Sequence, residues 1–472
     1  MGMRDTLRKF IEPHVGDLRI SKRSKGENAS RRAYRMGHLV GKDAYRELGR
    51  KIDGAGMRAP WNGDLYAILK ELYTEEDAEL IIKMPYGLAP IERLVEVTGM
   101  SRAKLERLLE GLCPRGLVMD LCIAGRYYYT ASPFALGFFE FTMMRTRGEV
   151  DFRKMARLFS AYLDGGDFQA ANAGNGETVS IMRALPWEGC VETDDYVEVL
   201  DYEKASAIVD ATDRFALGIC ACRHQRRHLG ENSCKAPLDS CSVFGSMSVD
   251  WMVRNGFGHE VSKAEMLANI DRSRDLGLVI SADNVQRNVR FMCHCCSCCC
   301  EAIRGITKHG YANTIVTSSF MAHFDRNACT GCGSCSRRCP VHAVGCVSDP
   351  DPRFRKNGRP RIEERLCIGC GVCAVQCKSG AMKLHRRAKR VMHPEDTFER
   401  VILQCLENGT LQNQLFDDPG GKTQAFMRGF AGAFLRLPTV KRALMSNVLR
   451  SRFLNAMKLG ARVGGKRILT QV

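Results

Sequence analysis

Cysteine is the residue type in this chain whose number and spacing could do chemistry. The 472-residue sequence has 23 cysteines, and the stretch CHCCSCCC places six of them between Cys293 and Cys300. A run of small thiols buries little apolar area and oxidises readily, so packing does not explain it. In a reducing compartment such grouping indicates metal binding rather than disulfides.

The cysteines divide into single residues and tight groups. Five stand alone and are expected to be buried thiols: Cys113, Cys122, Cys190, Cys346 and Cys405. The others form an upstream half-site, the CHCCSCCC stretch and a last group of eight. The first two sets comprise Cys220, Cys222, Cys234 and Cys241, then Cys293, Cys295, Cys296, Cys298, Cys299 and Cys300.

The last group consists of two copies of one motif. CTGCGSCSRRCP supplies Cys329, Cys332, Cys335 and Cys339, and CIGCGVCAVQC supplies Cys367, Cys370, Cys373 and Cys377. This spacing resembles the bacterial ferredoxin domain that binds two 4Fe-4S clusters, over about residues 324–385. The resemblance implies that one cluster is held by Cys329, Cys332, Cys335 and Cys377, and the other by Cys367, Cys370, Cys373 and Cys339. Zinc is the alternative, but a zinc site does not need the doubled pattern.

The chain departs from this ferredoxin pattern in two places. Lys378 replaces the proline expected after Cys377, and the hydrophilic insert DPDPRFRKNGRPR lengthens the connection between the motifs. We expect the insert to be a surface loop at which a partner docks. Basic residues also crowd the unit, where they would raise the cluster potential and favour an acidic partner or simply form a solvated face. They are Arg337, Arg338, Lys378, Lys383, Arg386, Arg387, Lys389 and Arg390.

The ten cysteines of the two central sets exceed the eight that two 4Fe-4S clusters would use. Neighbouring side chains of a strand point to opposite faces, so Cys295 and Cys296 are expected to approach different centres. The pattern predicts two metal centres or one larger cluster. Iron-sulfur binding is favoured, with zinc or a dithiol redox switch as alternatives. Surface positions rather than ligation are expected for His224, His228 and His294.

The elements that position these cysteines are expected to be mixed helices and strands, with the half-sites in loops. DYEKASAIVDATDRFALGIC predicts a helix that delivers Cys220, and Ser262 with Glu265 predicts a capping box at the start of another helix. The order CxCRH, CxCCxCCC and a two-cluster ferredoxin is similar to iron-sulfur proteins of anaerobic bacteria and archaea.

Residues 60–150 have a different character. PIERLVEVTG, SRAKLERLLEGLCPRG and LVMDLCIAGRYYYTAS are typical of helix, turn, helix, strand, turn, strand, which resembles a winged-helix domain. Such a domain could bind DNA through Arg102, Lys104, Arg107 and Arg126. Acidic residues on and before the same helix interrupt the basic face, so DNA binding is not expected and docking or dimerisation is favoured.

The formal charge of +17 is unevenly distributed. Residues 421–472 have no acidic residue and carry apolar side chains at helical spacing. Basic amphipathic helices of this kind suit an anionic membrane surface or an acidic groove on another protein, or else pack on their own chain. Their basic residues are Lys422, Arg428, Arg436, Lys441, Arg442, Arg450, Arg452, Lys458, Arg462, Lys466 and Arg467. SKRSKGENASRRAYRMGHLVGK, near the N-terminus, predicts a flexible or partner-wrapping arm.

These features predict an α+β multidomain chain. Its parts are a basic N-terminal arm (1–59), a winged-helix-like domain (60–150), a cysteine-rich metal-binding domain (151–323), a two-cluster ferredoxin domain (324–385) and a basic amphipathic helical extension (386–472). No segment reaches the roughly 18 uninterrupted apolar residues of a membrane span, which predicts a cytoplasmic protein, with attachment to the inner face of the membrane as a further option.

The favoured function is an electron-transfer protein that relays low-potential electrons to or from a partner oxidoreductase. Two 4Fe-4S clusters in the ferredoxin domain and one or two more in the central region would form the relay. Neither a dinucleotide-binding nor a phosphate-binding glycine motif is present. Two alternatives stay open, a reductase with a catalytic cluster at the central cysteines and a redox-sensing DNA-binding regulator.

Overall fold

The computed structural model describes residues 43–146, 148, 150–192, 199–231, 233–389, 391–463, 466 and 468. The basic arm up to residue 42 therefore lies outside the described residues, as do Arg390 and Arg467. The rest of the segment predicted as an arm contains a helix whose Leu48 and Ile52 are buried. No helix among the described residues is long and apolar enough to cross a membrane.

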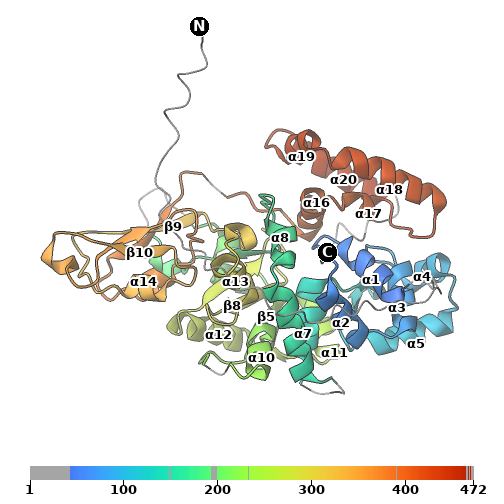
Figure 1. Ribbon diagram of the computed structural model, residues 1–472, viewed down its shortest axis with the longest axis horizontal. Helices are drawn as coiled ribbons and strands as arrows, with labels where there is room; N and C mark the ends of the chain where they lie inside the picture. The colour runs from blue at the N-terminus through green and yellow to red at the C-terminus, as the bar shows by residue number, and fades with distance from the viewer. Residues whose placement is uncertain are drawn as a thin grey trace, which may run out of the picture. The chain divides into compact units, whose positions relative to one another are not determined.

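The described chain is a mixture of helices and strands (Figure 1). The helices are α1 (Ala44–Asp53), α2 (Gly63–Leu72), α3 (Glu75–Lys83), α4 (Ile91–Thr98), α5 (Arg102–Leu112), α6 (Phe139–Met144), α7 (Phe152–Asp164), α8 (Asp167–Ala173), α9 (Ala205–Asp210), α10 (Ala221–His228), α11 (Ser246–Arg254), α12 (Lys263–Asp275), α13 (Glu301–Thr307), α14 (Ser334–Arg338), α15 (Val372–Val375), α16 (Thr397–Glu407), α17 (Leu411–Leu415), α18 (Lys422–Leu435), α19 (Pro438–Met445) and α20 (Arg450–Val463). The strands are β1 (Val118–Ile123), β2 (Arg126–Ala131), β3 (Met182–Ala184), β4 (Phe215–Ile219), β5 (Asp239–Phe244), β6 (Gly258–Val261), β7 (Val279–Asp283), β8 (Phe291–Cys295), β9 (Phe320–Phe324), β10 (Val344–Val347), β11 (Arg359–Ile362) and β12 (Met382–Arg386).

The N-terminal elements follow the predicted order of helix, turn, helix and hairpin. Ser101 accepts a hydrogen bond from the Lys104 amide and starts α5, whose leucines are buried. Ala124 and Gly125 have φ values of 50° and 77° and connect β1 to β2. Positive φ at both central residues is typical of the tight turn that joins two antiparallel strands.

A six-stranded sheet occupies the middle of the chain, in the order β3-β7-β8-β5-β4-β6, and its neighbouring strands are antiparallel. β8 lies between β7 and β5, with Val279 opposite Cys295 and Ser242 opposite Met292. The predicted capping box of Ser262 and Glu265 is present at the start of α12. Cys241, Cys293 and Cys295 lie on strands of this sheet, and the other central cysteines lie in the segments that follow β4 and β8.

The prediction of a helix that delivers Cys220 is wrong for most of residues 201–220. Only α9 and a single 3₁₀ turn at Asp201–Glu203 are helical there, and Cys220 directly follows the strand β4. Phe215, Ala216 and Leu217 of β4 are buried between β5 and β6. A short apolar run of this kind is compatible with a buried strand as well as with a helix, and pairing on both edges decides for the strand.

Two apolar cores cross the predicted domain limits. One runs from α1 to α7 and includes Val249, Trp251 and Phe257 of the middle region. The other joins the central sheet to the ferredoxin-type unit, from Met182 to Leu384. The domain limits at residues 150 and 323 remain predictions from the sequence. The apolar packing is continuous across both positions.

Candidate metal centres

Four cysteines of the two ferredoxin-type motifs line one small cavity. They are Cys339, Cys367, Cys370 and Cys373, and apolar side chains such as Ile368 and Leu384 complete the lining. All four cysteines are buried. The backbone amides of Ala343 and Ala322 donate to the sulfurs of Cys339 and Cys367 over 3.2 and 3.5 Å. Amides aimed at sulfur stabilise a negatively charged thiolate cluster.

The loop that carries three of these cysteines requires glycine. Gly369 and Gly371 have φ values of 70° and 79°, in the region that glycine tolerates best. A β-carbon at Gly369 would also lie only 2.1 Å from the carbonyl oxygen of Phe320. The backbone thus turns tightly around the cavity, which is the local geometry that a buried cluster needs.

The other cysteine loop, Cys329 to Cys335, is held by the insert. The insert lies largely at the surface, as expected, but it is an ordered hairpin in which β10 pairs with β11. Asn357 donates to the Gly331 carbonyl over 3.0 Å, and Phe354 is 1% exposed. This surface loop is ordered because Asp349 pairs with Arg326 and Arg359, which fastens both of its ends.

Cys346 of β10 is a cysteine whose role the sequence did not indicate. It is exposed, so the expectation that it is a buried thiol is wrong. A two-stranded sheet leaves side chains on its open face in solvent.

Burial raises the pKa of Cys335 to about 11, and the nearby thiols of Cys346, Cys329 and Cys332 add to this rise. A bound cation would offset the cost of deprotonating such a thiol.

Six of the ten central cysteines lie in a row beside the sheet, and we call them the six-thiol row. Cys293 and Cys295 share one face of β8 because side chains alternate along a strand. The thiol of Cys241 is within hydrogen-bonding reach of Cys293, and Cys295 lies between Cys293 and Cys300. Cys222 contacts Cys300 and Cys220, which completes the row. Cys222, Cys241, Cys293 and Cys295 belong to α10, β5 and β8, whereas Cys220 and Cys300 are the residues directly before α10 and α13.

The other four central cysteines form a second cluster, which we call the four-thiol group. Their sulfurs, those of Cys234, Cys296, Cys298 and Cys299, all lie within 4.8 Å of one another. Cys234 and Cys296 are 3.6 Å apart, as are Cys298 and Cys299. Cys295 and Cys296 thus belong to different clusters, in the manner that strand alternation predicts.

Arg223 lies between the two clusters. Its guanidinium is 1% exposed and donates to the Pro237 carbonyl over 2.8 Å and to Ser240 Oγ over 2.6 Å, and it also bonds the His294 carbonyl. A hydrogen bond from Cys299 lowers the pKa of Cys296 to about 5, against the effect of burial and with help from the charge of Arg223. One sequence signal could have identified this residue, namely its position in CxCRH directly after a pair of cysteines.

His294 contradicts the expected surface position because it is 2% exposed. It alternates with Cys293 and Cys295 along β8, so its ring faces the opposite side of the sheet. There it contacts Ser242 Oγ at 2.9 Å and Ser273 Oγ at 2.7 Å. Burial lowers its pKa to about 3. The sequence pattern alone could not place these polar partners on the far side of the strand.

Trp187 connects the ferredoxin-type unit to the central sheet. Its backbone amide donates to the Cys370 carbonyl over 3.2 Å, and its indole Nε1 donates to the Leu278 carbonyl over 3.1 Å. Leu278 packs against the four-thiol group, and the next residue, Val279, lies opposite Cys295 in the sheet. One buried residue therefore contacts a cysteine loop on one side and a segment beside both central clusters on the other.

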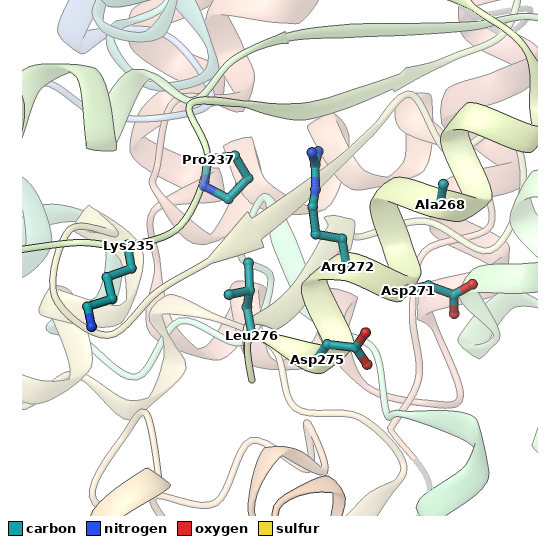
Figure 2. Close-up of a pocket in the computed structure, with 7 residues that line it drawn as sticks. All are labelled: Lys235, Pro237, Ala268, Asp271, Arg272, Asp275 and Leu276. Carbon is teal, nitrogen blue, oxygen red and sulfur yellow. The ribbon is translucent and has the colours of Figure 1, made fainter.

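A shallow cleft of about 650 Å³ lies beside Cys234. Figure 2 shows Lys235 and Pro237 on one wall, with the other wall formed by α12. The side chains that line this wall are Ala268, Asp271, Arg272 and Asp275 of α12 and Leu276, which follows the helix. The lining contains no cysteine, so none of the described thiols opens directly onto this cleft.

Comparison with known proteins identifies one domain. The family described as a 4Fe-4S binding domain matches residues 322–344, which contain the first ferredoxin-type motif. No curated protein and no solved structure matches the chain. Together with the clustered cysteines, this match makes the chain an iron-sulfur protein that binds 4Fe-4S clusters, with electron transfer as the general chemistry.

Proposed function

We propose that the protein relays low-potential electrons between a donor and a partner oxidoreductase through three 4Fe-4S clusters. A cluster of this type supplies one-electron chemistry. Two would be held by the ferredoxin-type motifs, and the third by four sulfurs of the six-thiol row that include those of Cys293 and Cys295. The observation that carries the proposal is the contact through Trp187 between the Cys370 loop and the strand opposite Cys295.

The assignment of cysteines to clusters follows from the two loops. The shared cavity supports a cluster held by Cys339, Cys367, Cys370 and Cys373. The remaining motif cysteines, Cys329, Cys332, Cys335 and Cys377, would hold the other, and the Met382 amide donates to Cys377 Sγ over 3.4 Å. This exchange of one cysteine between the loops is the arrangement of two-cluster ferredoxins.

Basic residues near the ferredoxin-type clusters would raise their potential. Arg337 donates to the Cys332 carbonyl over 2.9 Å, and Arg387 donates to the Cys367 carbonyl. Lys383 instead pairs with Glu192, whose carboxylate offsets part of the effect of the Lys383 charge on the ferredoxin-type clusters. The basic set is thus divided between residues that contact the cysteine loops and residues that serve the fold.

The two alternative functions have less support. A catalytic cluster needs an opening for substrate, and the cleft beside Cys234 has no cysteine in its lining. A DNA-binding regulator needs free cations, but Arg102 and Arg126 pair with Glu92, and Lys104 and Arg107 pair with Glu76. Paired cations are poor contacts for phosphate. We propose instead that the winged-helix-like part braces the central sheet, where Arg254 of α11 bonds Asp120 of β1.

The partner that we propose for the C-terminal helices is an anionic membrane surface. Phe426, Phe430 and Phe434 recur every four residues along α18 and are 72%, 69% and 56% exposed. Residues with this spacing share one face of a helix. The segment has no acidic residue, and the exposed cations of α18, α19 and α20 include Lys422, Arg442, Arg452 and Arg462. An exposed apolar stripe with basic neighbours is suited to the headgroup region of an anionic membrane.

Stopped-flow spectroscopy of protein purified without air tests the relay. A viologen radical should reduce the clusters, and the electrons should then pass to an added one-electron acceptor. A C293S/C295S variant should retain reduction of the ferredoxin-type clusters and lose one phase of the reaction. A wild-type protein that accepts no electrons from the radical would contradict the proposed function.

A further inference from the structure

We propose that the four-thiol group binds a single tetrahedral metal ion, zinc or iron, and not a 4Fe-4S cluster. Cys234, Cys296, Cys298 and Cys299 would be its four ligands. The proposal is independent of the relay, which uses the six-thiol row and the ferredoxin-type motifs. It assigns the ten central cysteines to two centres of different kind.

The sulfurs of the four-thiol group have the spacing of ligands that share a single metal ion. A metal–sulfur bond of about 2.3 Å in a tetrahedron places the ligand sulfurs about 3.8 Å from one another. The sulfurs of Cys234 and Cys296 are 3.6 Å apart, as are those of Cys298 and Cys299, and all four sulfurs lie within 4.8 Å of one another. The four ligands of a 4Fe-4S cluster bind four separate irons, so their sulfurs cannot all converge as closely as those of the four-thiol group.

The ferredoxin-type motifs provide an internal comparison. Their cysteines surround a cavity, and among the residues that the structure describes they do not gather into a group with this close spacing. The same chain thus contains two arrangements of four thiols, one around a space and one converging on a point. The difference is what a cluster and a single ion would each require.

The four-thiol group connects two segments that are distant in the sequence. Three ligands come from the turn between β8 and α13, in which the Cys300 amide donates to the Cys296 carbonyl over 3.2 Å. The fourth, Cys234, comes from the segment between α10 and β5, where the described residues form neither helix nor strand. A metal ion at the group would fasten this segment to the end of β8, as structural zinc sites do in small folds.

Basic and apolar residues surround the four-thiol group. Four thiolates and a divalent ion leave a net negative charge. Arg223 lies beside Cys296, and Lys235 follows Cys234 directly in the chain. Ala236 and Leu278 pack against the group and shield part of it from water. The surroundings therefore favour a closed structural site over an exposed catalytic one.

The test is metal and sulfide analysis of the full chain purified without air. C298S changes the exposed ligand, and C122S is the matched control because Cys122 lies outside both clusters. We expect C298S to lose about one equivalent of zinc or of iron with no loss of acid-labile sulfide, and C122S to lose neither. Loss of zinc identifies a zinc site, and loss of one iron without sulfide identifies a single-iron site.

Two results would overturn the proposal. One is the loss of about four irons together with sulfide in C298S, which would place a cluster at the group. The other is an unchanged metal content. If C298S does not fold, wild-type protein from cells grown in cobalt should show the absorption bands of tetrahedral thiolate-bound Co²⁺, and their absence would also reject the site. Because the readouts are sulfide and cobalt spectra, failure of the relay would not imitate either outcome.

Discussion

At the scale of single residues, Trp187 is the contact between the ferredoxin-type unit and the central sheet. W187F retains a buried aromatic ring but removes the indole donor to the Leu278 carbonyl. Losing this bond should cost about 1 kcal/mol of unfolding free energy. We also expect electron exchange between the ferredoxin-type clusters and the six-thiol row to slow several-fold, measured by flash reduction. Unchanged exchange with unchanged iron content would assign Trp187 a purely structural role.

Lys51 gives the fold a pH dependence. Its ammonium bonds the Met84 carbonyl and lies 3.5 Å from the centre of the Tyr86 ring. Burial, with a smaller contribution from Arg428 and against that of Asp417, lowers the pKa of Lys51 to about 7. Above pH 7 the folded chain releases this proton while the unfolded chain keeps it to about pH 10. The contribution of Lys51 to stability therefore rises with pH between these values.

The variant K51M should remove this rise, which amounts to about 1.4 kcal/mol per pH unit. Unfolding midpoints at several pH values from 7 to 9.5 would measure it, with the exposed Lys70 changed to methionine as the control. Equal slopes for K51M and the wild type would show that Lys51 is charged in the folded protein throughout this window.

At the scale of elements, α18 carries the proposed membrane contact. F426S/F430S/F434S should leave folding intact because all three side chains are exposed. Binding to phosphatidylglycerol vesicles should weaken by at least about tenfold, since each phenylalanine buried in the interface contributes roughly 1 kcal/mol or more. The control V253S removes an exposed apolar side chain from α11. Wild-type protein that sediments with neither anionic nor neutral vesicles would reject the proposal.

Local patterns predicted the elements whose partners lie close in sequence. The hairpin of β1 and β2, the capping box of α12 and the alternation along β8 all follow from residues within a few positions of one another. Alternation also anticipated that Cys295 and Cys296 separate. The choice between helix and strand for residues 215–219 was not local, because pairing with β5 and β6 decides it.

Two features that the sequence did not indicate, the order of the insert and the burial of His294, depend on contacts that are distant in sequence. The order in the insert comes from Arg326, which pairs with Asp349 from 23 positions away. His294 is buried because Ser242 and Ser273 come from a neighbouring strand and a helix. No pattern around either residue contains this information. The division of the ten central cysteines into six and four also appears only when loop and strand are brought together.

At the scale of the whole described chain, the central sheet shares an apolar core with the N-terminal helices and another with the ferredoxin-type unit. Parts that appear separable in sequence are therefore packed as neighbours. A relay benefits from this arrangement because rigid packing fixes the separation of the centres. The high positive charge is distributed in the same way, partly in ion pairs such as those of Lys458 with Glu395 and Glu399 and partly on the exposed C-terminal helices.

The measurement that tests the central claim most directly is iron and sulfide counting combined with EPR, on protein purified without air. Three clusters predict about twelve irons and twelve sulfides per chain, and C293S/C295S should retain about eight of each. The control C122S should match the wild type. About eight irons in the wild type would leave the six-thiol row without a cluster, and a protein that contains only zinc would contradict the account altogether.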